Sequence, residues 1–153
     1  MKVMDKNVCF GLIVATRGFF NPVLAGTARK ELLELLDELS IEYVIGSEDA
    51  TPHGTVENLE HAKIYAKLFR ENAERIDGVL VILPNFGDEL GVVQTLDMAK
   101  LNVPVLVQAC KDELDKVGVF SRRDAFCGKL SVCNNLYQYN IPFTDTTFHT
   151  CDI

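Results

Sequence analysis

Short apolar runs alternate along this chain with longer stretches in which apolar residues recur every three or four positions. The runs are rich in β-branched residues and end at glycine, proline or asparagine, which is typical of buried strands in a parallel sheet. They predict five strands, over residues 8–15, 41–45, 79–83, 103–107 and 141–149.

The stretches with spacings of three and four predict four helices, each with one apolar face. Asn21 and Pro22 suit the cap and the first position of the first helix, and Asp124 is a candidate cap for the fourth. Gly128 weakens the fourth helix by about 1 kcal/mol. The predicted buried faces are Leu24, Ala28, Leu32, Leu35 and Leu39; Leu59, Ala62, Ala66, Phe69, Ala73 and Ile76; Leu90, Val93, Leu96 and Ala99; and Phe126, Leu130, Cys133 and Tyr137.

Strands that alternate with helices over short connections imply right-handed crossovers and a parallel sheet. We therefore predict an α/β fold, a three-layer sandwich with a five-stranded parallel sheet in flavodoxin-like order. The 153 residues suit a single α/β domain, residues 1–153.

Composition narrows the class of function. A net charge of −7 argues against a nucleic-acid partner, which requires clustered Lys and Arg. No apolar run approaches the ~20 residues of a membrane span, and no signal-peptide pattern is visible. The five cysteines form no C-x-x-C pair. These observations predict a reduced, cytoplasmic protein without a membrane partner.

The loops that follow the first, third and fourth strands should meet at the carboxyl edge of the sheet, where open α/β sheets bind ligands. They carry a guanidinium, an amide, aromatic rings and carboxylates, a mixture that suits a polyhydroxylated ligand. The substrate-binding candidates are Arg17, Phe19, Asn85, Phe86 and Asp88.

Other chemistries find less support at this edge. Neither G-x-G-x-x-G nor the P-loop pattern follows the first strand, although a flavin site of flavodoxin type remains an alternative. No metal site or catalytic residue can be assembled from the carboxylates and histidines. Three of the candidates also have a structural explanation: Arg17 can bond loop carbonyls, Phe86 can pack on a helix, and Asp88 with Glu89 suits the start of a helix.

Three segments carry a resemblance to a known family. Residues 14–22 (Val-Ala-Thr-Arg-Gly-Phe-Phe-Asn-Pro), 83–89 (Leu-Pro-Asn-Phe-Gly-Asp-Glu) and 124–135 (Asp-Ala-Phe-Cys-Gly-Lys-Leu-Ser-Val-Cys-Asn-Asn) resemble the N-terminal domain of the L-fucose isomerase and L-arabinose isomerase family. The likeness covers essentially the whole chain.

The resemblance implies a part of a longer enzyme that interconverts aldoses and ketoses with a divalent cation, usually manganese, in a hexameric or similar homo-oligomer. In that family the metal ligands lie in later domains, and the first domain completes the sugar pocket of a neighbouring subunit. The corresponding wall residues here are Arg17 and Phe86, with Asn85 and Asp88 beside them.

The leading hypothesis is therefore the first domain of a sugar isomerase-like protein, inactive alone and continued by further structure after Ile153. The parent would be an intramolecular oxidoreductase that shares its sugar substrate among domains. One alternative is a stand-alone flavodoxin-like domain that binds a sugar or flavin. Another is an assembly module that packs subunits together.

Overall fold

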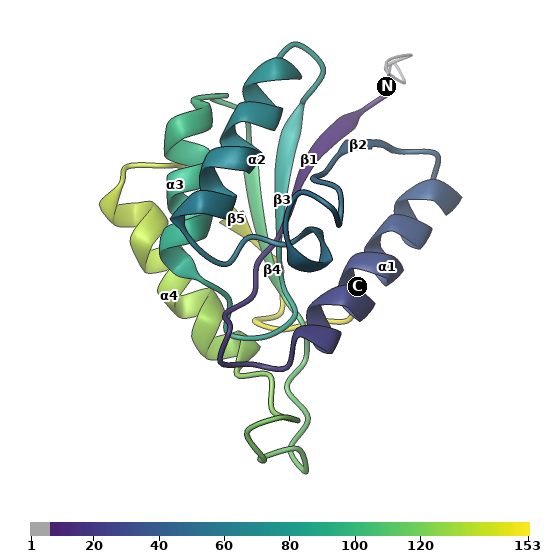
Figure 1. Ribbon diagram of the computed structural model, residues 1–153, viewed down its shortest axis with the longest axis vertical. Coiled ribbons are helices and arrows are strands. Elements are labelled where there is room, and N and C mark those ends of the chain that lie inside the picture. Colours follow the sequence, from purple (N-terminus) through teal and green to yellow (C-terminus); the bar gives the residue numbers. More distant parts are fainter. Residues whose placement is uncertain (1–6) are drawn as a thin grey trace.

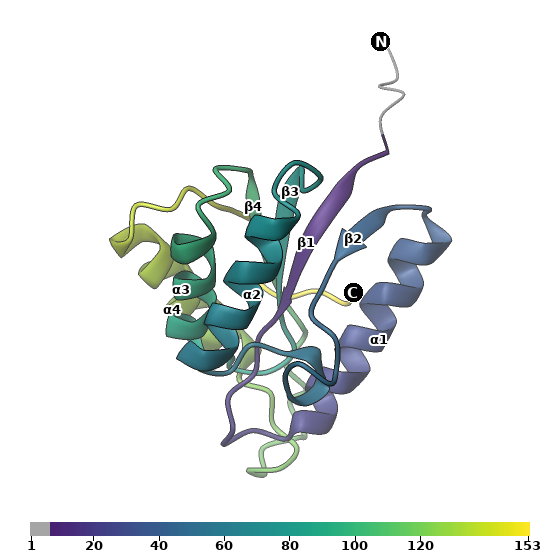
Figure 2. The ribbon, with the colours of Figure 1, turned by 45° about the horizontal axis from the view of Figure 1, so that its top comes forward.

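The centre of the molecule is a parallel sheet with helices on both faces (Figures 1 and 2). The computed structural model describes residues 7–153. Across the sheet the strand order is β2-β1-β3-β4-β5. This confirms the predicted α/β sandwich and its flavodoxin-like order. The strands are β1 (Cys9–Val14), β2 (Glu42–Val44), β3 (Gly78–Leu83), β4 (Val105–Ala109) and β5 (Thr144–Asp145).

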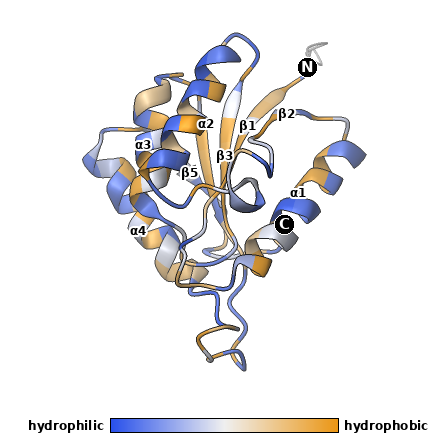
Figure 3. Cartoon of the chain, in the orientation of Figure 1, coloured by the Kyte–Doolittle hydropathy of each residue, from blue (hydrophilic) through white to orange (hydrophobic). Residues whose placement is uncertain are grey.

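The helices divide unequally between the two faces of the sheet. One face packs against α1, and the larger apolar cluster on the other face joins the sheet to α2, α3 and α4 (Figure 2). Apolar residues concentrate in the central strands, as Figure 3 shows. None of the helices in residues 7–153 is long and apolar enough to cross a membrane. The helices are α1 (Pro22–Glu38), the 3-10 turn η1 (Pro52–Gly54), α2 (Leu59–Glu71), α3 (Glu89–Ala99) and α4 (Ala125–Gln138).

The start of α1 follows the sequence prediction. The Asn21 side chain accepts a 3.0 Å hydrogen bond from the Val23 N–H, and Pro22 occupies the first helical position. Asparagine satisfies an N–H that the helix cannot satisfy itself, and proline has no N–H there to lose. The chain therefore leaves β1 through a short loop and enters α1 directly.

The apolar face of α4 differs from the prediction. The face turned to the core contains Ala125, Gly128, Lys129, Val132 and Leu136. A Cβ atom placed on Gly128 would overlap the backbone carbonyl of Phe86, so small residues must face the sheet here. The larger side chains turn outward instead: Phe126, Leu130 and Tyr137 are exposed, and Cys133 is half-buried.

The other helices differ from the prediction in smaller ways. In α1 the buried residues are Ala25, Ala28, Leu32 and Leu36, so Leu35 and Leu39 are exposed because the buried face is rotated by about one residue. Two further predicted core positions, Leu59 and Leu90, are exposed in the first turns of α2 and α3. The second helix ends at Glu71, so Ala73 and Ile76 lie beyond it, and of these two Ile76 is buried.

The last strand is much shorter than predicted. Only Thr144 and Asp145 pair with β4, opposite Leu106 and Val107. After Asp145 the chain turns, because the Thr146 hydroxyl donates to the Phe148 carbonyl and accepts from the Lys129 ammonium. Residues 146–149 therefore leave the sheet edge.

Lys129 is a buried cation that fixes this final segment. It is 2% exposed. Its Nζ lies 3.0 Å from the Thr146 hydroxyl, 3.1 Å from the His149 carbonyl and 3.6 Å from the Asp145 carboxylate. A buried ammonium is stable only with such partners, so α4 and residues 145–149 are held together.

The first turn of α4 is capped from a distance. Asp124 occupies the cap position in the left-handed region but makes no side-chain cap hydrogen bond. Asp112 takes the predicted role of Asp124: its two carboxylate oxygens accept from the N–H groups of Ala125 and Phe126, at 2.9 and 3.1 Å. Residues 111–123 consequently form a loop with both ends tied, and it projects beyond the carboxyl edge of the sheet (Figure 1).

Replacement of Gly128 by alanine tests the close approach of α4 to the Phe86 loop. The added methyl group would overlap the Phe86 carbonyl, so we expect Gly128→Ala to lower the free energy of unfolding by about 1–3 kcal/mol in urea titrations. Gly26→Ala in α1 is the matched control, because its Cβ would meet only a His53 ring nitrogen at 3.5 Å. That control should be neutral or stabilising by up to ~1 kcal/mol. Equal stabilisation of both variants would refute the contact.

Candidate functional site

The pairing of β1 with β3 brings the two candidate loops to one edge. Val14 is opposite Ile82 in this pair, and the Ala15 N–H donates to the Ile82 carbonyl at 3.0 Å. Residues 16–20 and 84–88 therefore leave the sheet side by side, at the carboxyl edge predicted for a ligand site.

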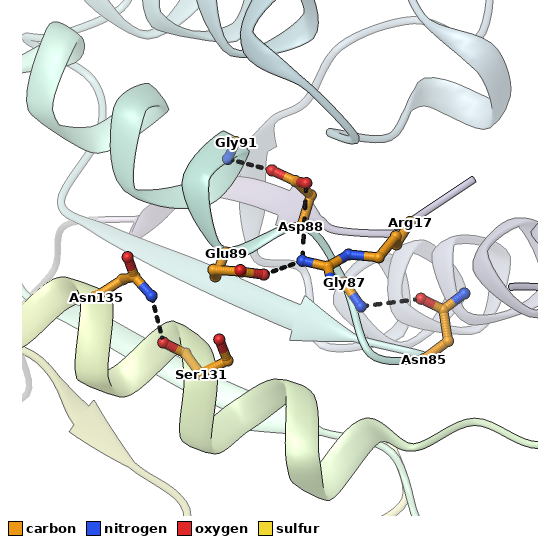
Figure 4. Close-up of polar contacts among 8 residues, drawn as sticks. All are labelled: Arg17, Asn85, Gly87, Asp88, Glu89, Gly91, Ser131 and Asn135. Carbon is orange, nitrogen blue, oxygen red and sulfur yellow. Dashed lines mark hydrogen bonds and ion pairs between the residues drawn. The ribbon is translucent and has the colours of Figure 1, made fainter. Parts of the chain in front are cut away.

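Arg17 is the centre of the polar contacts at this edge (Figure 4). Its guanidinium forms an ion pair with Glu89 and lies 3.9 Å from the Asp88 carboxylate. The same group lies over the Phe86 ring, 4.6 Å from the ring centre, in a cation–π contact. The structure thus brings together three candidate residues, and it adds Glu89, which was expected at this edge but not named as a substrate-binding candidate.

Asn85 lies behind this cluster and joins the two loops. Its side chain donates to the Thr16 hydroxyl at 2.8 Å and accepts from the Gly87 N–H at 3.1 Å. The residue is 0% exposed. Asn85 therefore offers no surface to a ligand at this edge and holds the two loops together instead.

Gly87 makes the tight turn next to Asn85 possible. Its φ of +73° lies in the left-handed region, and a Cβ there would come within 2.8 Å of the Leu83 side chain. Both facts favour glycine. Phe86 and Asp88, on either side of Gly87, are both half-buried.

Asp88 has a second role as the cap of α3. Its carboxylate accepts a 2.6 Å hydrogen bond from the Gly91 N–H. Burial raises the pKa of Asp88, while the Gly91 N–H and the Arg17 guanidinium act in the opposite direction. Asp88 is thus a carboxylate whose desolvation is only partly offset by its partners.

The aromatic residues form a small cluster beside Arg17. Phe20 is buried and stacks against Phe86, with ring centres 6.1 Å apart. Phe19 meets Phe20 edge-on at 5.6 Å and is 58% exposed. Because the Phe86 ring already contacts Arg17 and Phe20, Phe19 offers the more open aromatic surface of the cluster.

Arg122 joins this cluster from the projecting loop. Its guanidinium carbon lies 6.0 Å from the Phe19 ring centre and 5.8 Å from that of Phe20, and its Nε is 3.1 Å from Asp124. The Asn21 amide also donates to the Phe120 carbonyl, at 3.1 Å. Sequence reasoning missed Arg122, because the loop of residues 111–123 has no periodic pattern that fixes its position.

The charged groups of this edge do not form a metal site. Within residues 7–153 no group of three or more His, Cys, Asp or Glu side chains could hold a metal ion. The described residues therefore do not fit the manganese ion that the resemblance implies.

Comparison with protein families identifies the chain. The family of fucose/sulfoquinovose isomerase N-terminal domains matches residues 11–153. The chain belongs to this family. The resemblance to fucose isomerase is thereby confirmed, and the match includes all three loops of the carboxyl edge.

Two further comparisons gave no match to this fucose/sulfoquinovose isomerase N-terminal domain, either among curated proteins or among solved structures.

The capping role of Asp88 in the isomerase domain can be tested by substitution. Asp88→Asn keeps an acceptor for the Gly91 N–H, so its free energy of unfolding at neutral pH should stay within ~1 kcal/mol of wild type. Asp88→Ala should lose about 1 kcal/mol, because the N–H then has no side-chain partner. Urea unfolding of the three proteins measures both effects.

Comparison of wild type with Asp88→Asn also tests the raised pKa of Asp88. Since its folded-state pKa lies above the ordinary value of about 3.9, its contribution to stability is complete below that pH. It is lost as the pH rises through the folded-state pKa. The unfolding free energy of wild type minus that of Asp88→Asn should therefore fall between pH ~3 and ~6. A rise over this range would mean that Arg17 outweighs burial.

Proposed function

We propose that this chain forms one wall of the sugar pocket in an aldose–ketose isomerase of the fucose type and contributes contacts between subunits. The observation that carries the proposal is the Arg17–Asp88–Glu89 cluster beside the exposed ring of Phe19, at the carboxyl edge of a domain of this family. The wall would bind and orient the sugar and leave the reaction to residues outside this chain.

The groups at this wall match the surface of a sugar. Hydroxyl groups can accept from the Arg17 guanidinium and donate to the carboxylates of Asp88 and Glu89. The C–H face of a pyranose can pack on Phe19, as a ligand site combines apolar contact area with a few placed polar groups. Asn85 and Phe20 would support these residues from behind, since both are buried.

The reaction itself requires groups that this wall does not supply. Aldose–ketose interconversion moves hydrogen between C1 and C2 and is assisted by a cation that polarises the carbonyl. Because the described residues do not fit a metal, we propose that the manganese or similar cation is held by another part of the protein. The chain alone would then be inactive.

Titration with L-fucose monitored by NMR tests the wall directly. We expect amide and Arg17 side-chain shifts confined to residues 16–20 and 85–89, with millimolar affinity, because only one side of the sugar is covered. Phe19→Ala should weaken the binding at least about threefold, a loss of ~0.7 kcal/mol. Tyr137→Ala is the control, because Tyr137 is an even more exposed aromatic on α4, and it should leave the affinity unchanged.

Two outcomes of this titration would contradict the proposal. If the signals of the Arg17 loop do not shift when L-fucose is in 100-fold molar excess over the protein, the proposed sugar wall is refuted. Submicromolar binding of L-fucose or of flavin mononucleotide by the chain alone would favour the stand-alone ligand-binding domain.

The projecting loop of residues 111–123 supports a role in subunit contacts. Leu114 is 96% exposed and Phe120 is 80% exposed, and Val117 is also exposed next to them. Apolar groups gathered on a projecting loop are typical of protein–protein contact sites. This loop adjoins the Phe19 cluster, so a neighbouring subunit bound here would also lie at the sugar wall.

Light scattering of the purified protein tests this contact. We expect a homo-oligomer whose mass falls, or whose dissociation constant rises at least tenfold, when Leu114 and Phe120 are both changed to serine. Leu39→Ser provides a control, since this exposed leucine lies at the far end of α1. Unchanged assembly of the loop variant would exclude the loop as a contact.

A cytoplasmic location is part of the same proposal. All five cysteines lie in the described part of the chain as free thiols. Free thiols are typical of proteins kept in a reducing compartment. A sugar isomerase in central carbohydrate metabolism would work in that compartment.

A further inference from the structure

We infer that the Arg17–Asp88–Glu89 cluster makes this wall select neutral sugars and reject sugars that carry an acidic group. The inference rests on the proposed function. It distinguishes between the two sugars in the family's name, because fucose is uncharged whereas sulfoquinovose carries a sulfonate. The residues that decide the selection are Asp88 and Glu89.

The guanidinium at this wall is already engaged. Arginine binds an acid group best through two parallel hydrogen bonds. Arg17 is ion-paired with Glu89, lies 3.9 Å from Asp88 and has the Phe86 ring against it. Both carboxylate contacts are made by Nη2, so an incoming sulfonate that seeks two hydrogen bonds would have to compete with a carboxylate that is covalently part of the wall.

The start of α3 already holds a carboxylate of the protein. A helix N-terminus attracts anions through its free N–H groups. Here the Asp88 carboxylate accepts from the Gly91 N–H at 2.6 Å, so one of these N–H groups is already bound to a negative charge. The negative charge that suits this position is thus already supplied by the protein.

The other charged groups near this cluster do not reverse the sign of its net charge. One guanidinium faces two carboxylates, so the cluster carries net negative charge, and the Glu57 carboxylate lies directly against Gly18 in the same loop. Arg122 is balanced by Asp124 at 3.1 Å, and Arg123, which donates to the Pro84 carbonyl, lies 3.8 Å from the Glu113 carboxylate. A sulfonate at this edge would therefore meet repulsion, whereas neutral hydroxyls would meet charged acceptors.

The test compares two sugars that differ only in the acid group. Quinovose (6-deoxyglucose) and sulfoquinovose, its 6-sulfonate, are titrated separately into the chain while the Arg17 and Phe19 signals are followed by NMR. We expect quinovose to bind at least about fivefold more tightly, equivalent to ~1 kcal/mol, which is the order of one charge–charge repulsion at 4 Å in water. The ratio should shrink as salt is added.

Substitution of one carboxylate separates a local cause from the overall charge. Glu89→Gln should reduce the preference to about onefold, because it removes the charge paired with Arg17 and keeps the side-chain shape. Glu74→Gln changes the net charge equally at the opposite edge of the sheet, where Glu74 is exposed, and should leave the preference intact.

The outcomes distinguish this inference from the proposed function. Equal or tighter binding of sulfoquinovose by the wild-type chain would overturn the selection for neutral sugars while the sugar wall itself stands. If Glu74→Gln also loses the preference for quinovose, that preference arises from the overall net charge, and the role of Glu89 is overturned. Failure of quinovose, sulfoquinovose and L-fucose alike to shift these signals would overturn the sugar wall and this selection together.

Discussion

The parallel pairing of β1 with β3 is the constraint on which the rest of this edge depends. Five residue pairs, from Phe10 opposite Gly78 to Val14 opposite Ile82, fix where the two strands end. A change of register by one residue would reverse the faces of every side chain in the strand. The Asn85–Thr16 hydrogen bond and the Arg17–Glu89 ion pair both require this one register, so the sheet sets how the two loops meet.

Much of the fold follows from periodicity, but the rotation of the helices does not. Apolar runs and spacings of three and four identified the type and order of the five strands and four α-helices in residues 7–153. In α4, however, the large residues Phe126, Leu130 and Tyr137 are on the outer face, because Gly128 must meet the Phe86 backbone. Such a close approach is a property of two distant segments, and the helix sequence by itself favours burial of its largest side chains.

The meeting of the loops at the candidate site could be predicted from the sequence, but their contacts only in part. Position after a strand was enough to bring Arg17, Phe86 and Asp88 together. The inward turn of Asn85 and the pairing of Arg17 with Glu89 depend on side-chain geometry between loops. A single sequence does not show which carboxylate pairs with Arg17, because several carboxylates are equally plausible partners for it.

Two consecutive residues of α4 connect parts of the molecule that otherwise lie apart. Gly128 rests on the Phe86 backbone, and the next residue, Lys129, holds Thr146 and His149 through its ammonium group. Helix α4 therefore couples the loop after β3 to residues 145–149. A force applied to residues 145–149 would be transmitted through this helix to the turn that carries Phe86.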